Sequence, residues 1–274
     1  NQDPCVLLAS ARLDAFCSTV SRRLRVAMAT ARKCRCILFD LDDTLVPTTR
    51  IDRQAIADAS VAAAAVLSRP ASDAPSIAEA FRRELAASPF PPDASDIPVD
   101  EWRCALWGRA MGAPDLQGAA VRQVHDLWHS KRLSDFKLPH DVIAMVRRLQ
   151  DAGYTTAIIT NGHKDVQRAK LAACDAVALF GDRIIVSGEQ PEWKPAPSIF
   201  HTALFMVGAR AEESIMVGDG LKTDVLGAIR AGLLASVWVR GAGVEELPRP
   251  EDPELQPTHT IASVLDLEPI LAQL

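Results

Sequence analysis

The sequence predicts an α/β protein whose parallel β-sheet carries a separate, wholly helical insert. Three observations support this prediction: β-rich segments alternate with helical segments from residue 139 onward, one apolar segment stands alone at 34–39, and only helical patterning lies between them. Strands that are separated by single helices favour βαβ units with right-handed crossovers, and therefore a parallel sheet. A chain of 274 residues is long enough to bury such a core and a smaller second domain.

The first strand and the insert come next along the chain. The apolar run 34–39 predicts a buried strand, and a polar loop starts after it at Asp40. The insert is expected to contain four helices, separated by clusters of Pro and Ser that break helices; the helices are expected at 52–67, 76–87, 100–111 and 117–131. We assign residues 34–50 and 133–274 to the core and residues 51–132 to a helical cap, with hinge loops near 47–50 and 133–138.

The remaining core elements alternate regularly. Pro139 favours a helix start at 139–151, and Gly153 provides its C-terminal cap. Further strands are expected at 154–160, 183–186, 214–217 and 235–239, with a short edge strand at 259–261. Helices are expected at 163–173, 196–207, 223–231 and 263–272, and a Pro-rich, acidic loop at 248–257.

Composition limits the class of protein. The net charge of −5 does not point to nucleic acid, and no apolar run is long enough to cross a membrane. The six cysteines lack zinc-like pairing and are expected to be reduced structural thiols. Residues 1–33 are rich in Arg and Ser, which favours a disordered leader or a targeting segment. We expect a monomer or weak dimer that is cytoplasmic, or organellar if 1–33 is a transit peptide.

Carboxylates follow two of the expected strands. Asp40 and Asp42 come directly after the strand 34–39, while Asp219 follows 214–217 and Asp224 begins the next helix. The carboxyl ends of parallel strands open onto one crevice, so these side chains should converge there. Carboxylate oxygens without His or thiolate ligands suit Mg²⁺.

Groups suited to phosphate occur at the same expected edge. Thr160, Asn161 and Gly162 end the strand 154–160 and offer a hydroxyl and backbone N–H groups. Lys194 precedes a helix and adds a positive charge. Taken singly, each of these signals is explained equally well by a turn or a surface position, so their weight comes from their order along the sheet.

The segments 40–45, 160–162, 194–195 and 218–224 resemble, in this order, the four motifs of the haloacid dehalogenase-like (HAD) hydrolase superfamily. The resemblance covers about 34–272 and implies a Rossmann-like core with a C1-type helical cap after the first motif. It also implies a magnesium-dependent phosphatase acting on a small phosphate monoester. In that scheme Asp40 is the nucleophile that forms an aspartyl-phosphate, and Asp42 is the general acid and then the general base.

The same resemblance implies the remaining site residues. Metal contacts would come from Asp40, Asp219, the backbone carbonyl of Asp42 and, from farther out, Asp224. The transferring phosphoryl group would be held by residues of the second and third motifs and by the peptide after Asp40, namely Leu41, Thr160, Asn161, Gly162 and Lys194.

Asp42 argues against hydrolysis of a carbon–halogen bond, because true dehalogenases of the superfamily lack an acid there. A narrower resemblance to phosphatases of an acidic sugar phosphate spans 160–170, 188–200, 216–225 and 235–239, and it departs at Trp193 and Gly220. Phosphoglycolate or nucleotide monophosphate hydrolysis and a phosphomutase remain alternatives. A binding protein without activity is disfavoured, because the carboxylates and the lysine of the motifs are all present.

The cap determines the leaving group in such enzymes and is the less informative part of the sequence. Four basic residues are candidates for contacting an acidic sugar or, equally simply, solvated surface charges: Arg50, Arg53, Lys131 and Arg132. Three tryptophans are expected in the interior of the cap: Trp102, Trp107 and Trp128.

Overall fold

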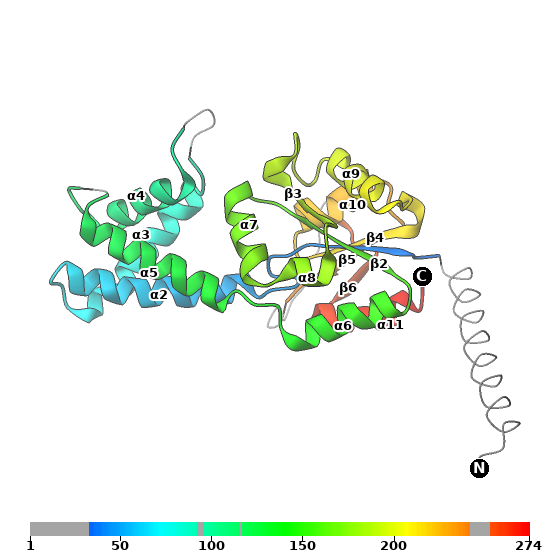
Figure 1. Cartoon of the computed structure of the whole chain (residues 1–274), viewed down its shortest axis with the longest axis horizontal. Helices are drawn as coiled ribbons and strands as arrows, with labels where there is room; N and C mark the ends of the chain where they lie inside the picture. Colours follow the sequence, from blue (N-terminus) through cyan, green and yellow to red (C-terminus); the bar gives the residue numbers. More distant parts are fainter. Residues whose placement is uncertain (1–32, 92–95, 116, 242–252) are drawn as a thin grey trace, which may run out of the picture.

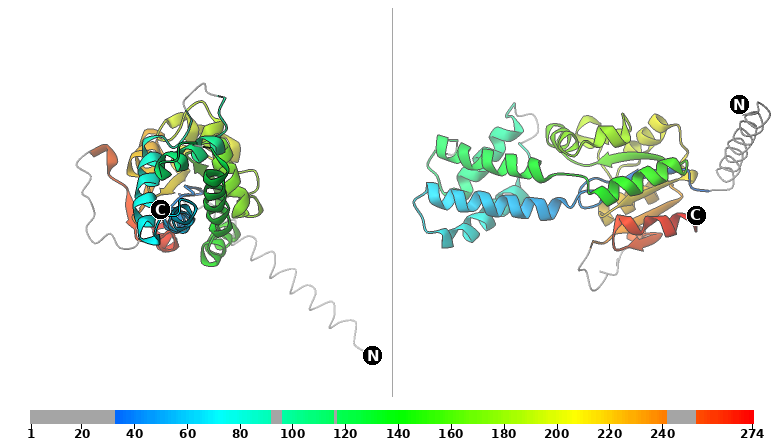
Figure 2. Two further views of the ribbon diagram at one scale, coloured as in Figure 1. Left: turned by 90° about the vertical axis from the view of Figure 1, so that its left-hand side faces the viewer. Right: turned by 60° about the horizontal axis from the view of Figure 1, so that its bottom comes forward.

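The chain folds into two lobes joined side by side, a helical cap and an α/β core (Figures 1 and 2). The computed structural model describes residues 33–91, 96–115, 117–241 and 253–274. The expected leader at 1–33 therefore lies outside the described residues except for Lys33, and so does the first half of the loop expected at 248–257.

The core is built on one six-stranded sheet of order β3-β2-β1-β4-β5-β6, in which every described pairing is parallel. The strands are β1 (Cys36–Phe39), β2 (Thr155–Thr160), β3 (Ile184–Val186), β4 (Ser214–Gly218), β5 (Ala235–Val239) and β6 (His259–Ile261). The order reverses around β1, which places β2 on one side of it and β4 on the other. Crevices at such a reversal are where ligands bind in open α/β sheets.

Helices cover both faces of the sheet, because alternate strand residues point to opposite sides. Ile37 and Phe39 pack with α6 (His140–Asp151), α8 (Ala176–Phe180) and α11 (Leu267–Leu271). On the other face, Cys36 and Leu38 pack with α9 (Pro197–Val207) and α10 (Leu226–Arg230). The fold class predicted from the sequence is confirmed.

The cap is an antiparallel helical lobe with its own apolar core. It comprises α2 (Thr48–Val66), α3 (Ala74–Ala87), α4 (Val99–Met111) and α5 (Ala119–Asp135). At its centre, the Phe81 ring stacks on Trp107 with centroids 3.8 Å apart, and Trp128 meets Phe81 edge-on at 5.3 Å. Trp107 and Trp128 are fully buried, as expected, whereas Trp102 is half-buried.

Several element bounds differ from the expected ones. Helix α2 begins at Thr48 and α5 runs to Asp135, so the segments expected to be hinge loops are partly helical. Pro47 favours a helix start directly after it, and nothing in the sequence breaks α5 until Pro139 approaches. The helix expected at 223–231 begins as a wide turn at Leu221–Val225, and α8 was not foreseen.

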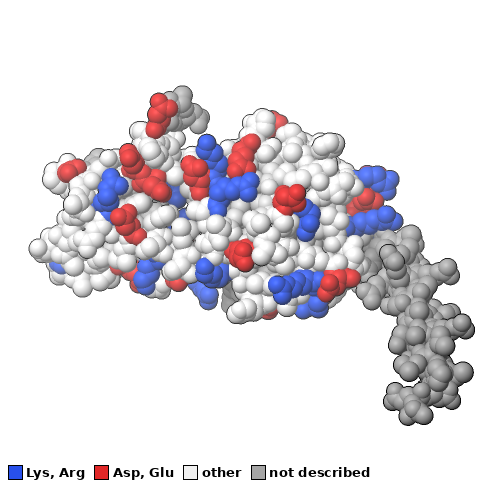
Figure 3. Space-filling view, viewed as in Figure 1, with Lys and Arg blue, Asp and Glu red and all other residues white. Residues whose placement is uncertain are grey.

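The cysteines and the surface charges are as the composition led us to expect. The four described cysteines, Cys34, Cys36, Cys104 and Cys174, are buried thiols that form no disulfide with one another. Acidic and basic side chains are interspersed over the face in Figure 3. Within the described part of the chain, no helix combines the length and the apolarity needed to span a bilayer.

Candidate active site

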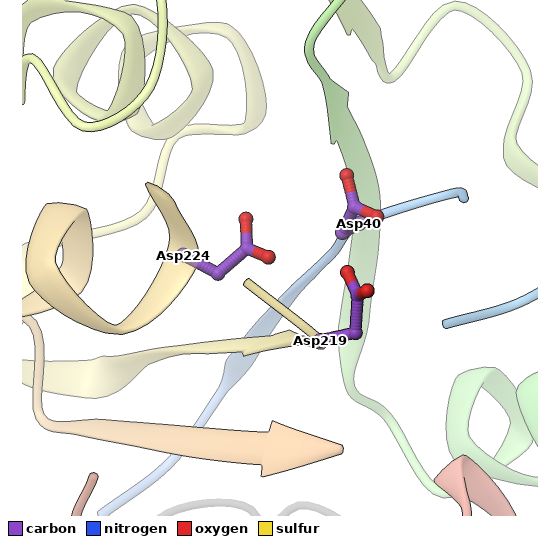
Figure 4. Close-up of side chains that lie close together, drawn as sticks. All are labelled: Asp40, Asp219 and Asp224. Atoms are coloured by element: carbon purple, nitrogen blue, oxygen red, sulfur yellow. The ribbon is translucent and has the colours of Figure 1, made fainter. Parts of the chain in front are cut away.

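Three carboxylates converge at the carboxyl end of the central strands. Asp40 follows β1, Asp219 follows β4, and Asp224 lies in the turn that leads into α10 (Figure 4). One oxygen from each lies within 4.8 Å of the others. The sheet order therefore brings together acids that are up to 184 positions apart in the sequence.

Lys194 lies inside this cluster and is almost completely buried. Its Nζ donates to Asp40 Oδ1 at 2.6 Å and to Asp224 Oδ1 at 2.6 Å. A third bond at 2.8 Å goes to the carbonyl of Ile159 in β2. The ammonium group thus uses all three of its donors, and it links the first, third and fourth motifs through one side chain.

The electrostatics of the cluster indicate excess negative charge. Burial raises the pKa of Asp40 to about 8, with Asp224 and Asp42 adding to the rise and Lys194 opposing it. Burial and the neighbouring Asp224 likewise raise the pKa of Asp219 to about 7. Burial alone would lower the pKa of Lys194, but Asp224 and Asp40 outweigh burial and raise it. A divalent cation at these acids would relieve the repulsion.

Gly218 makes room for this arrangement at the end of β4. A Cβ at this position would lie 2.3 Å from Asp224 Oδ2 and 2.4 Å from its Cγ, so only glycine fits. Asp224 Oδ2 also accepts from the backbone N–H of Gly220 at 2.9 Å. The carboxylate of Asp224 is therefore fixed by its lysine, by a backbone donor and by the close approach of the strand.

The carboxylate of Asp42 is held apart from the three-acid cluster. It accepts from Thr48 Oγ1 at 2.7 Å, from Gln167 Nε2 at 2.9 Å and from Lys170 Nζ at 2.7 Å. Burial would raise the pKa of Asp42, but Lys170 and the three hydrogen bonds outweigh it and lower the pKa. Thr48 opens the first cap helix, and Gln167 and Lys170 belong to α7 (Lys164–Ala173), so cap and core both hold this carboxylate.

The groups expected to hold a phosphate are partly engaged with one another. The Asn161 side chain bonds twice to the Lys194 backbone, at 2.9 and 3.0 Å, and so fixes the third motif against the second. The N–H of Gly162 donates to Ser187 Oγ at 2.9 Å.

The hydroxyl of Thr160 can still donate a hydrogen bond. Its Oγ1 accepts from Gln167 Nε2 at 2.5 Å, which leaves the hydroxyl proton of Thr160 available. The carbonyl of Leu41 accepts from Leu45 and Val46 and closes the turn of the first motif.

Three residues that hold Asp42 were not predicted from the sequence: Thr48, Gln167 and Lys170. Gln167 and Lys170 are three positions apart in the helix that follows the second motif, so both face the same side of α7. That spacing is the signal in the sequence that could have identified them. Thr48 carries no comparable signal, because its role depends on where the cap helix begins.

Comparisons with known proteins identify the family. A family model described as haloacid dehalogenase-like hydrolase matches residues 34–232. N-acylneuraminate-9-phosphatases of Rattus norvegicus and Homo sapiens are each 32% identical to the chain over 242 residues, covering 87% of it and 94% of theirs. Phosphoserine phosphatase of Thermus thermophilus is 32% identical over 252 residues, covering 81% of the chain and 92% of its own length.

Solved structures show the same fold. The HAD-hydrolase YfnB from Bacillus subtilis, bound to magnesium, has a TM-score of 0.60 at 22% identity and covers 88% of this chain and 99% of its own. A HAD phosphatase from Thermococcus onnurineus has a TM-score of 0.57 at 22% identity, covering 86% and 97%.

The chain therefore belongs to the haloacid dehalogenase-like hydrolase family. Within the family it is an enzyme of the phosphatase type, as its curated relatives are. The narrower resemblance at 160–170 and 188–200 is to N-acylneuraminate-9-phosphatase, and the relatives of that name bear it out.

Proposed function

We propose that the chain is a magnesium-dependent phosphomonoester hydrolase that acts through an aspartyl-phosphate on Asp40, with N-acylneuraminate 9-phosphate as its substrate. The observation that carries the proposal is the position of Lys194 Nζ, which lies 2.6 Å from both Asp40 and Asp224. A buried lysine fixed between two carboxylates places positive charge where a phosphoryl group would meet the nucleophile.

The described carboxylates fit a magnesium ion. Asp40, Asp219 and Asp224 offer hard oxygen ligands within 4.8 Å of one another. The pKa values of Asp40 and Asp219 are raised, and a bound cation would lower them again. Asp40 and Asp219 would hold the ion, with the backbone carbonyl of Asp42; Asp224, whose oxygens contact Lys194 and Gly220, would orient this set from behind. When bound, the ion would offset charge on the phosphate oxygens.

The proposed nucleophile is the carboxylate of Asp40. Because Lys194 bonds to its Oδ1, we propose that Oδ2 is the oxygen that attacks phosphorus. The O–P bond to Asp40 forms while the bond from phosphorus to the leaving oxygen breaks. Asp42 is ionised while Lys170 holds it, so it must first leave Lys170 and take up a proton from solvent, and it then gives that proton to the leaving oxygen. Asp42 then takes a proton from the water that attacks the aspartyl-phosphate, which releases inorganic phosphate and restores Asp40.

Asp42 must change partners to do this. Its oxygens are engaged by Thr48, Gln167 and Lys170, so the described arrangement is a resting one. Because Thr48 belongs to the first helix of the cap, movement of the cap relative to the core would loosen one of the three contacts.

The substrate is proposed from similarity and is tested directly. The relatives with 32% identity over most of the chain include N-acylneuraminate-9-phosphatases, but also a phosphoserine phosphatase and, at 29% identity, a glyceraldehyde 3-phosphate phosphatase. Phosphate release should be measured with Mg²⁺ for N-acylneuraminate 9-phosphate, phosphoserine, glyceraldehyde 3-phosphate, phosphoglycolate and a nucleotide monophosphate.

We expect kcat/KM to be highest for the acidic sugar phosphate. A higher value for any other compound would contradict the substrate assignment. Absence of phosphate release from all of them, with isomerised product appearing only when a bisphosphate is added, would instead identify a phosphomutase and contradict the hydrolase.

A further inference from the structure

A small cavity lies at the seam between cap and core, beside the helix α7 that also holds Asp42. It has a volume of about 80 Å³, and it is lined by Asp100 and Arg103 of α4, His129 and Arg132 of α5, and Asp165 and Val166 of α7. Helix α7 thus contributes to the wall of this cavity and, through Gln167 and Lys170, to the contacts that hold Asp42.

Arg103 is a buried cation whose charge is only partly balanced. Burial lowers its pKa to about 10, and Asp100 and Asp52 oppose that lowering without forming an ion pair with it. Its residue is only 5% exposed, and its Nε has no hydrogen-bond partner. Its guanidinium lies 5.7 Å from the centre of the Trp128 ring and 6.0 Å from that of Phe90. Among the described residues, no carboxylate forms an ion pair with it. Cation–π contacts recover only part of the cost of burying a guanidinium group, so the site is suited to an anion.

The second guanidinium in the wall is already neutralised. Arg132 pairs with Asp52 of α2 through Nε and, at 3.2 Å, through Nη2, and it lies 5.6 Å from the Trp128 ring centre. Burial lowers the pKa of His129 below its ordinary value of 6.5, so this side chain is mostly neutral at pH 7. Of the two guanidinium groups in the wall, Arg103 is therefore the one that has no ion pair with a described carboxylate.

The charges in the wall favour one class of ligand. Arg103 is a single guanidinium group without an ion pair to a described carboxylate, and it matches a singly charged carboxylate better than a dianionic phosphate. Asp100 and Asp165, which are exposed at the rim of the cavity, would repel a group of higher negative charge. A planar carboxylate also matches the fork of N–H donors of a guanidinium group.

We propose that Arg103, with Arg132 beside it, binds a carboxylate carried by the leaving group of the substrate in the cavity between α4, α5 and α7. The proposal rests on the proposed phosphatase function and names the chemical feature that the cap recognises. It applies to sugar acids and to other carboxylated alcohols long enough to reach from Asp42 to the cavity.

The cavity is physically connected to the catalytic groups. The Phe90 ring, beneath Arg103, also contacts His163 after the second motif at 5.8 Å and Trp193 before Lys194 at 6.1 Å. Arg132 is close enough to Lys170 to contribute to the lowering of its pKa, after burial. A ligand at Arg103 would therefore lie against the loops that present the phosphate-binding residues.

The protein-side test compares Arg103→Gln and Arg103→Lys with the wild type and with Arg109→Gln. Arg109 lies on the same helix, pairs with Glu84 and does not line the cavity, which makes it a matched control. Steady-state kinetics should be measured for N-acylneuraminate 9-phosphate and for glucose 6-phosphate, which lacks a carboxylate.

Arg103→Gln should lower kcat/KM for the carboxylated substrate by about 10- to 100-fold more than for glucose 6-phosphate, mainly through KM, as expected for loss of a charge-assisted hydrogen bond. Arg103→Lys should recover part of the loss, and Arg109→Gln should show no selective loss. Equal losses for both substrates in Arg103→Gln would overturn the proposal.

The ligand-side test needs no variant and is valid even if Arg103→Gln fails to fold. Calorimetry with the wild-type protein should show that N-acylneuraminate binds at least about 10-fold more tightly than its methyl ester, because esterification removes the charge. Equal affinities would overturn the proposal, and tighter binding of a sugar bisphosphate than of the carboxylated sugar phosphate would assign the cavity to a second phosphate instead. A wild-type protein that binds the free acid selectively but releases no phosphate would contradict the phosphatase function alone.

Discussion

Lys170 Nζ lies 2.7 Å from Asp42 Oδ1; the Lys170 side chain is buried, and that of Asp42 is half-buried. The pair keeps the proposed general acid ionised in the described arrangement, since the pKa of Asp42 is lowered despite its burial. The contribution of this pair to stability is present above the ordinary Asp pKa of 3.8 and is lost as the pH falls through the lower folded-state value.

Lys170→Met should therefore change the pH dependence of catalysis. Without the ammonium group, burial dominates and the pKa of Asp42 rises, so the limb of the kcat/KM profile that Asp42 governs should move to higher pH. The free energy of unfolding at pH 7 should fall by about 1–3 kcal/mol, because a buried carboxylate loses its charged partner. Lys164→Met, an exposed position on the same helix, is the control. Identical pH profiles for the two variants would show that Lys170 does not act on Asp42.

Magnesium should stabilise the protein more at high pH than at low pH. In the metal-free protein, Asp40 and Asp219 have pKa values raised to about 8 and about 7, so the folded state retains protons that the unfolded state releases. Metal-free stability should therefore fall as the pH rises from about 4 toward 8, and Mg²⁺ should offset this loss by replacing the protons.

Thermal unfolding at pH 6 and pH 8, with and without Mg²⁺, measures the effect. The rise in Tm should be larger at pH 8. Activity should stop in EDTA and return with Mg²⁺ but not with Ca²⁺, which favours looser, higher coordination. Full activity in chelator would contradict the proposed requirement for Mg²⁺.

Gly218→Ala should damage the site directly. The new Cβ would lie 2.3 Å from Asp224 Oδ2, and Asp224 cannot retreat without breaking its bond to Lys194. We expect a loss of about 1–3 kcal/mol in stability from overpacking, together with a large fall in kcat. Gly112→Ala is the control: Gly112 ends α4 with a φ of 64° and has open space around its Cβ position, so alanine there costs stability without touching the site. Parallel losses of kcat in both variants would mean that Asp224 is not positioned as described.

The topology of the sheet could be predicted from the sequence, whereas the side-chain contacts of the site could not. The sheet and the convergence of Asp40 with Asp219 follow from strand and helix alternation, because the carboxyl ends of parallel strands share one edge. The bonds of Lys194 and the contacts of Asp42 could not be predicted, because they depend on how a helix or loop rotates each side chain. Arg132 was expected to contact an acidic sugar or to be a solvated surface charge; it is buried and paired with Asp52, so the solvated alternative is wrong. Arg103 was not identified at all, because its burial without an ion pair to a described carboxylate depends on how the helices of the cap pack.

The central claim is that Asp40 attacks phosphorus, and phosphate release by Asp40→Asn tests it most directly. The assay should use N-acylneuraminate 9-phosphate, or whichever monoester the wild type turns over fastest, at saturating Mg²⁺. Asp43→Asn is the control, because Asp43 sits outside the cluster, bonds to Thr49 and has a φ of 55° that Asn tolerates. We predict that Asp40→Asn stays folded by circular dichroism and loses more than about a thousandfold in kcat, while Asp43→Asn retains most of the activity. Turnover by folded Asp40→Asn at a rate near that of the wild type would contradict the assignment of Asp40 as the nucleophile.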